Sequence, residues 1–176
     1  MSDEIFRSAV RSTFAFEGLY SDDPRDPGGE TYRGISRRTH PDWPGWAIVD
    51  RARGRRDFPA CLAGDAELDR LTAELYRVKY WQPLRCDELP ATIAPKVFDI
   101  GVNLGIGRAT KLLQQVCGVE PDGVIGPDTL RAANTGEPKI LLGCLRAAVG
   151  GYYRGLIVGR PDLAVYLNGW LRRAAA

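Results

Sequence analysis

The sequence predicts a mainly α-helical protein with one small β-hairpin directly after its first helix. Apolar side chains recur at helical spacing through most of the chain, most regularly in residues 65–81 and 138–156. Residues 21–30 break this pattern, because they are dense in aspartate, proline and glycine, which favour turns. No internal repeat or low-complexity segment is found, and 176 residues suit one domain or two small lobes.

Composition argues against several classes of function. A net charge of +2 is too small to indicate nucleic-acid binding by itself. The cysteines form no CxxC pair and His40 is the only histidine, which argues against a zinc site or a Cys–His nucleophile. We expect free buried thiols, although the even number of cysteines permits two disulfides. The four cysteines are Cys61, Cys86, Cys117 and Cys144.

The first helix is expected to run from Ser2 to Glu17. Ser2 suits the N-cap, and the acidic Asp3 and Glu4 follow in the first turn, where the helix dipole favours them. Gly18 is a typical C-terminal stop, which puts Glu17 in the last turn. There the dipole and apolar neighbours disfavour the ionised carboxylate, so Glu17 is predicted to donate a proton. The alternative is an ordinary solvated glutamate.

A turn-rich ribbon follows this helix. Asp23 and Asp26 each precede a proline, which holds an aspartate in an extended conformation. The pair Gly28-Gly29 then allows a tight reversal of the chain. Residues 31–36 are therefore expected to return as the second strand of a hairpin.

Residues around this ribbon suit the hydrolysis of a glycosidic bond. That reaction needs a carboxylic acid that protonates the leaving oxygen, and usually a second carboxylate or a group that positions water. Glu17 can supply the acid, and Asp26 and Thr31 can supply the second function. Asp22 and Asp23 compete with Asp26 for the role of second carboxylate.

Residues 16–36, FEGLYSDDPRDPGGETYRGIS, resemble the signature of glycoside hydrolase family 108, the lysozyme-like N-acetylmuramidases of phage and prophage endolysins. The family pattern is approximately E-G-G-Y, a short spacer and D-x-G-G-x-T-x-x-G-I, and it favours Asp26 as the second carboxylate. Leu19 departs from it, because the family usually has a second glycine there. The order of Glu17, Asp26 and Thr31 also resembles the catalytic group of tailed-phage lysozymes. The matching positions are Glu17, Gly18, Tyr20, Asp26, Gly28, Gly29, Thr31, Gly34 and Ile35.

Residues 36–64 are predicted to be irregular. Trp43 and Trp46 in this segment either stack on a sugar or, as we prefer, anchor a long loop to the body of the protein. A basic cluster follows, which either contacts an anionic glycan or phosphate or is simply a solvated loop. The cluster consists of Arg51, Arg53, Arg55 and Arg56.

Two further helices are expected in the middle of the chain. Residues 65–81 form an amphipathic helix with Asp65 as its N-cap, and Trp81 at its end either lines the cleft or fills the core. The next helix begins near residue 91 and is apolar on most sides, so it should be buried. Asp99 and Asn103 lie four residues apart on it and must find polar partners. By the resemblance, Asn103 lies near the active site and Asp99 belongs to a structural network.

The last third of the chain is predicted to be helical as well. One helix ends at Gly118, a normal C-terminal stop, and Pro127 opens the next one. Between them, the phrase D-G-x-x-G-P-x-T at residues 122–129 resembles peptidoglycan-binding modules. Helices over residues 138–156 and 161–173 complete the chain.

These observations and the resemblance predict a lysozyme-like α+β fold with two lobes. Residues 1–90 would form a catalytic lobe with Glu17 and the hairpin, and residues 91–176 a helical lobe that resembles a peptidoglycan-binding domain and packs on the first. The resemblance implies cleavage of the β-1,4 bond between N-acetylmuramic acid and N-acetylglucosamine, with no metal or organic cofactor. The residues expected to contact substrate are Tyr20, Tyr32, Trp81 and Asn103.

Two other functions compete with this prediction. One is a non-catalytic peptidoglycan-binding or secretion-accessory protein on the same scaffold. The other is nucleic-acid binding through the arginine cluster, which the small net charge does not support. We expect a monomer whose partner is peptidoglycan, with neither nucleic acid nor stable membrane insertion. No signal peptide is evident, so we expect synthesis in the cytoplasm and action in the periplasm or cell wall after holin-dependent release, as the resemblance implies.

Overall fold

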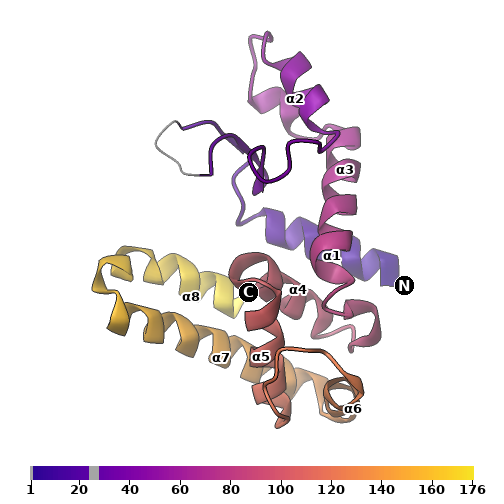
Figure 1. The fold of residues 1–176 in the computed structure, drawn as a ribbon, viewed down its shortest axis with the longest axis vertical. Coiled ribbons are helices and arrows are strands. Elements are labelled where there is room, and N and C mark those ends of the chain that lie inside the picture. Colours follow the sequence, from indigo (N-terminus) through magenta and orange to yellow (C-terminus); the bar gives the residue numbers. More distant parts are fainter. Residues whose placement is uncertain (1, 24–27) are drawn as a thin grey trace. The chain divides into compact units, whose positions relative to one another are not determined.

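The computed structural model describes residues 2–23 and 28–176, and it is mainly helical, as predicted (Figure 1). Short helical turns, η1 to η4, connect several of the longer elements. The helices and strands are α1 Ser2–Phe14, β1 Tyr20–Ser21, β2 Thr31–Tyr32, β3 Ile35–Ser36, α2 Trp46–Ala52, η1 Ala60–Leu62, α3 Ala66–Tyr76, η2 Arg77–Trp81, η3 Cys86–Glu88, α4 Ala94–Leu104, α5 Ile106–Cys117, α6 Pro127–Thr135, α7 Pro138–Gly159, η4 Pro161–Tyr166 and α8 Leu167–Ala175.

The chain divides into two compact units. One is Val10–Val78, which holds the small sheet, and the other combines Met1–Ala9 with Lys79–Ala176. Helix α1 therefore contributes its first half to one unit and its second half to the other. The predicted boundary near residue 90 separates a catalytic from a peptidoglycan-binding lobe by function, which these compact units do not test, so it stays a prediction.

The sheet of the unit Val10–Val78 has three short antiparallel strands in the order β1-β2-β3. Tyr32 is the partner of Tyr20 on one side and of Ile35 on the other. The expectation of a single strand over residues 31–36 was wrong, because the chain reverses at Arg33 and Gly34, where φ is +44° and +77°. Positive φ at both central residues is the geometry of a tight two-residue hairpin turn.

The end of α1 also differs from the prediction. The helix stops at Phe14, and the backbone N–H of Phe16 donates to the Thr13 carbonyl at 3.0 Å, so Glu17 lies beyond the helix and not in its last turn. The dipole argument for protonation of Glu17 therefore does not apply. At the other end Ser2 is the first helical residue, not the N-cap, and its hydroxyl donates to the Asp87 carboxylate.

The segment predicted to be irregular, residues 36–64, contains helix α2 and the turn η1. Trp46 opens α2 and is buried, with its indole N–H donating to the His40 carbonyl at 2.7 Å. Trp43 lies edge-to-face with Trp46 at 5.2 Å and stacks on Tyr32 at 5.9 Å. Both tryptophans therefore anchor this segment to the core, which is the interpretation preferred from the sequence.

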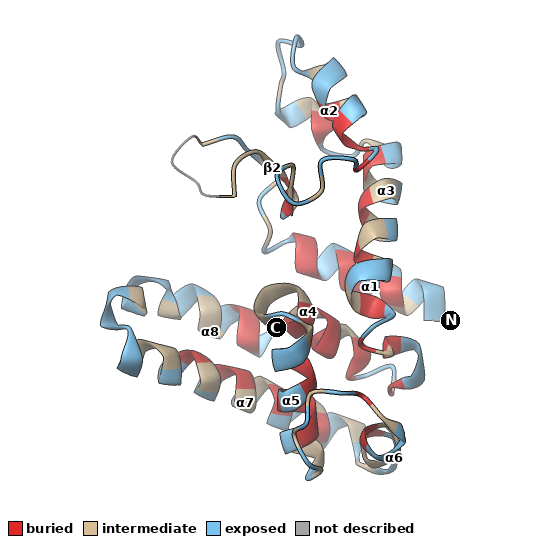
Figure 2. Ribbon diagram, viewed as in Figure 1, coloured by how far each residue is buried: buried red, intermediate tan, exposed pale blue. Residues whose placement is uncertain are grey.

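The larger unit is built around helix α4, which packs against α5 and α7 (Figure 2). Val97 and Phe98 of α4 are fully buried, as the apolar sequence of this helix predicts. Phe98 lies edge-to-face with Trp81 at 5.6 Å and with Phe6 of α1 at 6.0 Å. Gly105, at φ +83°, separates α4 from α5.

Several local signals act as the sequence predicts. The Asp65 carboxylate caps α3 by accepting from the N–H groups of Glu67 and Leu68 at 3.1 and 2.9 Å. Gly118 ends α5 with a left-handed φ of +70°, and Pro127 opens α6. These ends are set by local chemistry, which explains why the sequence locates them well.

The thiols and the lengths of the helices agree in part with the expectations from the sequence. All four cysteines lie in the described ranges and are free; Cys86 is buried and Cys144 is exposed, so the expectation of buried thiols holds for only part of the set. Burial raises the pKa of the Cys86 thiol. Among the described helices, none is both long and apolar enough to cross a membrane.

Candidate functional site

Glu17 lies against the tight turn that joins β2 to β3. A methyl group added at Gly34 would be 3.0 Å from Oε2 of Glu17 and 2.9 Å from the hydroxyl oxygen of Tyr76. The carboxylate and the phenol therefore meet at the backbone of Gly34. Gly34 is exposed and Glu17 is half-buried, so solvent reaches this point.

Hydrogen bonds fix the turn beside Glu17. The Tyr76 hydroxyl donates to the Arg33 carbonyl at 2.7 Å, and the Arg33 N–H donates to the Leu19 carbonyl at 3.0 Å. The guanidinium of Arg33 lies over the Phe14 ring at 5.0 Å, a favourable cation–π geometry. The unusual positive φ of Arg33 is thus held from both sides, which stabilises the turn beside Glu17.

Thr31 begins β2, two residues before this turn, and is half-buried. It is paired across the sheet with Ser21 on β1 and with Ser36 on β3. Asp26, the predicted second carboxylate, lies outside the described residues. Of its two competitors, Asp22 is 3.5 Å from a guanidinium nitrogen of Arg53.

Behind the sheet, Glu30 joins several charged groups. Its carboxylate accepts from the Tyr20 hydroxyl at 3.1 Å, from Nε of Arg37 at 2.5 Å and from Nη2 of Arg53 at 2.6 Å, and its side chain is only 9% exposed. Burial, together with the nearby negative charge of Glu30, raises the pKa of Tyr20 to about 12. Tyr20 is therefore neutral and held by Glu30 at physiological pH.

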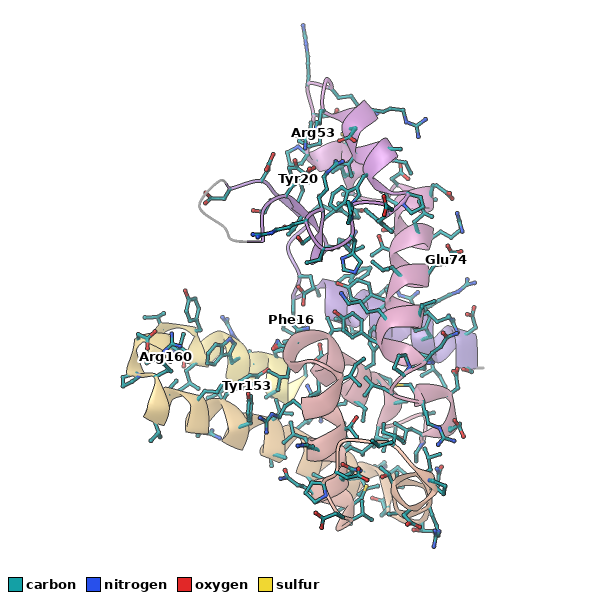
Figure 3. The ribbon with its side chains drawn as sticks, viewed as in Figure 1. Phe16, Tyr20, Arg53, Glu74, Tyr153 and Arg160 are labelled. Atoms are coloured by element: carbon teal, nitrogen blue, oxygen red, sulfur yellow. The ribbon has the colours of Figure 1, made fainter. Side chains whose placement is uncertain are left out.

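The same cluster reaches helix α2, and it can be followed at the labels Tyr20 and Arg53 in Figure 3. Arg37 donates to Asp50 at 2.6 Å and lies over the Trp46 ring at 4.3 Å. Hydrogen bonds from Arg37 lower the pKa of the Asp50 carboxyl. Arg53 therefore belongs to a structural network that ties the sheet to α2. The other three arginines of the cluster are exposed, as the solvated-loop interpretation expects.

Two of the predicted substrate-contacting residues are core residues. Tyr32 is 0% exposed, and its hydroxyl donates to the Leu62 carbonyl at 3.3 Å. Trp81 is 1% exposed, and its indole N–H donates to Asp87 at 2.7 Å. The surroundings of Trp81 match the alternative in which it fills the core, and Tyr32, for which only a substrate contact was expected, is a core residue as well.

Asn103 belongs to a polar cluster of the larger unit. With its amide oxygen turned towards Arg173, it accepts from Nη1 at 3.1 Å and from Nε at 3.2 Å. Arg173 also pairs with Asp99 at 3.0 Å, and buried Lys96 donates to the Arg173 carbonyl at 2.6 Å. Asp99 therefore belongs to a structural network, as expected. Burial lowers the pKa of Lys96, although Asp99 opposes this shift.

The motif at residues 122–129 folds around one buried glutamine. Gln114 donates to Asp122 at 2.7 Å and to the Val124 carbonyl at 3.0 Å, and accepts from the Gly123 N–H at 2.9 Å. The Asp122 carboxylate also accepts from the Val124 N–H at 2.8 Å. This hydrogen bond and the one from Gln114 lower the pKa of Asp122. A groove of about 670 Å³ lies beside this loop and along α6. Across the described ranges, no group of three acidic, cysteine or histidine side chains is arranged to hold a metal ion.

The sequence did not reveal Tyr76 or Glu30 as part of this site. Tyr76 comes 43 residues after the carbonyl that it binds, so no local pattern connects the two. Glu30 lies inside the recognised motif, but the motif does not assign it a role. The only hint in the sequence was an acidic residue followed by several arginines, among them its partners Arg37 and Arg53.

Comparison with known proteins gives the family of the chain. The family model described as "Glycosyl hydrolase 108" matches residues 10–105, and the one described as "Predicted Peptidoglycan domain" matches residues 108–175. A solved structure of Brucella abortus SagA is 29% identical, covers 98% of this chain and 91% of its own, and superposes with a TM-score of 0.69. The search among curated proteins found no match. The chain thus belongs to the glycosyl hydrolase 108 family, with a predicted peptidoglycan domain in its C-terminal part.

Proposed function

We propose that this protein cleaves the β-1,4 bond between N-acetylmuramic acid and N-acetylglucosamine in peptidoglycan, with Glu17 as the general acid. Its family supports a glycoside hydrolase, and its C-terminal domain supports a peptidoglycan substrate. No cofactor is required, because a carboxylic acid and an activated water suffice for this hydrolysis.

The observation that carries the proposal is the position of the Glu17 carboxylate. It sits at a solvent-accessible point, against a glycine without a side chain to cover it and close to the Tyr76 hydroxyl. The hairpin strand that leads into this turn begins with Thr31, a polar residue of the motif that the sequence predicts to act beside Glu17. A general acid needs this combination of a fixed position and access to the leaving oxygen.

We propose that Asp26 and Thr31 position the water or stabilise the positive charge of the transition state. Among the three aspartates between β1 and β2 in the sequence, Asp22 is already close to Arg53, which leaves it less suited to this role. Asp26→Asn should therefore lower kcat far more than Asp22→Asn or Asp23→Asn. The anomeric configuration of the first product, read by NMR, distinguishes inversion from retention.

The decisive experiment is digestion of purified peptidoglycan by the wild type, Glu17→Gln and Glu74→Gln. Glu74 is an exposed glutamate on α3 that pairs with Arg70, so it provides a matched control for the same chemical change (Figure 3). We expect Glu17→Gln to be about a hundredfold to ten-thousandfold slower. Glu74→Gln should cleave at the wild-type rate, and mass spectrometry should find muramic acid at the new reducing ends.

Other outcomes would contradict specific parts of the proposal. Equal rates for the wild type and Glu17→Gln would remove Glu17 from the mechanism, and reducing ends of N-acetylglucosamine would overturn the assigned bond. If the wild type sediments with the cell wall without cleaving it, the non-catalytic binding protein becomes the correct description.

A further inference from the structure

Three aromatic rings stack in a row from the interior of the larger unit to its surface. Tyr153 of α7 lies 5.2 Å from Trp170 of α8 at an interplanar angle of 26°, and Trp170 lies 5.9 Å from Tyr166 at the same angle. Tyr153 is buried, Trp170 is half-buried, and Tyr166 is 57% exposed. The row therefore ends in a tyrosine that is supported on one side and open to solvent.

The surroundings of this row are apolar and basic. Val165, next to Tyr166, is among the most exposed large apolar side chains of the described chain. In residues 151–173 the only acidic residue is Asp162, and it is already paired with Arg160, which Figure 3 labels. Arg154 and Arg172 are exposed. The hairpin of α7 and α8 thus combines an exposed ring with an excess of positive charge.

A further cation lies at the other end of the row. The guanidinium of Arg108 lies over the Tyr152 ring at 4.7 Å, and that ring is 6.1 Å from Tyr153. Arg108 is exposed. Every member of this row lies within residues 108–175, the range that matches the predicted peptidoglycan domain.

We propose that Tyr166, supported by Trp170, binds the glycan strand of peptidoglycan by stacking against the face of a sugar ring. The inference rests on the proposed function, since it assigns a place where the same substrate is held. A sugar ring presents C–H groups on one face, which pack well on an aromatic ring. The stem peptides of peptidoglycan carry carboxylates, which complement the basic hairpin. Stacking on Trp170 keeps Tyr166 in place, so less entropy is lost on binding.

The test measures sedimentation of the full-length protein with purified peptidoglycan sacculi, in the Glu17→Gln background so that the wall is not digested. Tyr166→Ala and Tyr166→Leu should each weaken binding about fivefold to tenfold, because both lose the aromatic ring. Since Leu keeps an apolar side chain, its effect reports the ring and not apolar area alone. Tyr166→Phe should bind within about twofold of the parent. Val158→Ala, an exposed apolar change on the same hairpin, should have no effect.

The two proposals fail in different ways: digestion of the sacculi by the Glu17→Gln parent would contradict Glu17 as the acid, whereas the stacking proposal is judged by binding alone. Parent-like binding by Tyr166→Leu would overturn the stacking proposal, as would an absence of sedimentation by the parent protein. If Tyr166→Leu bound sacculi like the parent but bound anionic lipid vesicles more weakly than the parent, the surface would be reassigned to a membrane. Since Tyr166 is exposed, its variants should keep the parent circular dichroism spectrum.

Discussion

Gly34 is the residue where backbone geometry and catalytic placement meet. Its φ of +77° belongs to the region that favours glycine, and a side chain there would press on Glu17 and Tyr76. The family pattern contains this glycine, and the structure gives a physical reason for it. The turn needs the positive φ, and the carboxylate needs the space.

We predict that Gly34→Ala lowers kcat on peptidoglycan about tenfold to a hundredfold, because the added methyl displaces the Glu17 carboxylate. The matched control is Gly64→Ala, which has the same φ of +77° but no atom within 4 Å of the added methyl. Both variants should lose about 1 to 2 kcal/mol in the free energy of unfolding. Equal kcat values for the two would show that backbone strain, and not the position of Glu17, explains the effect.

Tyr20 provides a test of the charge cluster by pH. Burial and Glu30 raise its pKa to about 12, so the folded protein holds this proton more tightly than the unfolded chain does. This contribution to stability is complete below pH 10 and is lost as pH rises towards 12.

The difference in tyrosinate absorbance between wild type and Tyr20→Phe should therefore have its midpoint near pH 12, not near the ordinary value of 10. In a Glu30→Gln background the midpoint should move down, since a negative neighbour has been removed. A midpoint near 10 in the wild-type background would contradict the contact between Tyr20 and Glu30.

At the scale of elements, the sheet is too small to be stable alone, so it depends on anchors. Its strands contain two residues each. Glu30 connects this sheet to α2 through Arg37 and Arg53. Tyr32, a residue of the middle strand, stacks on Trp43. The hairpin beside Glu17 is therefore held by side chains from residues 37–53, the segment that follows it and contains α2.

We predict that Glu30→Gln lowers the free energy of unfolding by about 1.5 to 3 kcal/mol, because the nearly buried carboxylate loses its charged hydrogen bonds to Arg37 and Arg53, although both arginines are partly exposed and keep Asp50 as a partner. Urea denaturation followed by tryptophan fluorescence measures this change. Glu67→Gln breaks an ion pair with Arg70 at a site that is 54% exposed, and it should change stability by less than about 1 kcal/mol. If the two variants are equally stable, the network does not anchor the sheet.

Helices were predictable from the sequence where the signal is local. Asp65, Gly118 and Pro127 mark helix ends through their own hydrogen bonds or φ angles, and the apolar run of α4 identifies a buried helix. One local signal failed, because α1 stops at Phe14 and not at Gly18. Other errors fall where distant contacts decide the backbone. The turn at Arg33 is stabilised by Tyr76, and α2 forms where its first tryptophan packs into the core.

The candidate site shows the same division. Glu17, Thr31 and Gly34 could be found from the motif, because they lie within 18 residues of one another in a recognisable pattern. Tyr76 and the contacts of Glu30 could not, since both depend on how the chain folds back on itself. The predicted substrate contact of Tyr32 came from the motif, and that of Trp81 from its place at the end of the helix predicted over residues 65–81; neither signal carries information on burial.

At the scale of the whole molecule, the compact units do not coincide with the ranges of the two family models. The N-terminal residues Met1–Ala9 belong to the same compact unit as Lys79–Ala176. Within that unit the Phe6 ring lies 5.1 Å from Trp81 and 6.0 Å from Phe98. A fragment cut at residue 108 would lack all three rings, so the C-terminal family range is not expected to fold as stably as the complete unit.

We therefore predict that Phe6→Ala lowers the free energy of unfolding by about 3 to 5 kcal/mol, because it opens a cavity beside Trp81 and Phe98. Phe6 is 2% exposed, whereas Phe16, near the other end of the same N-terminal segment, is 44% exposed. Phe16→Ala should cost less than about 1 kcal/mol in denaturant unfolding. A small effect of Phe6→Ala would show that residues 79–176 fold without the N-terminal helix, and the C-terminal part could then be treated as an independent domain.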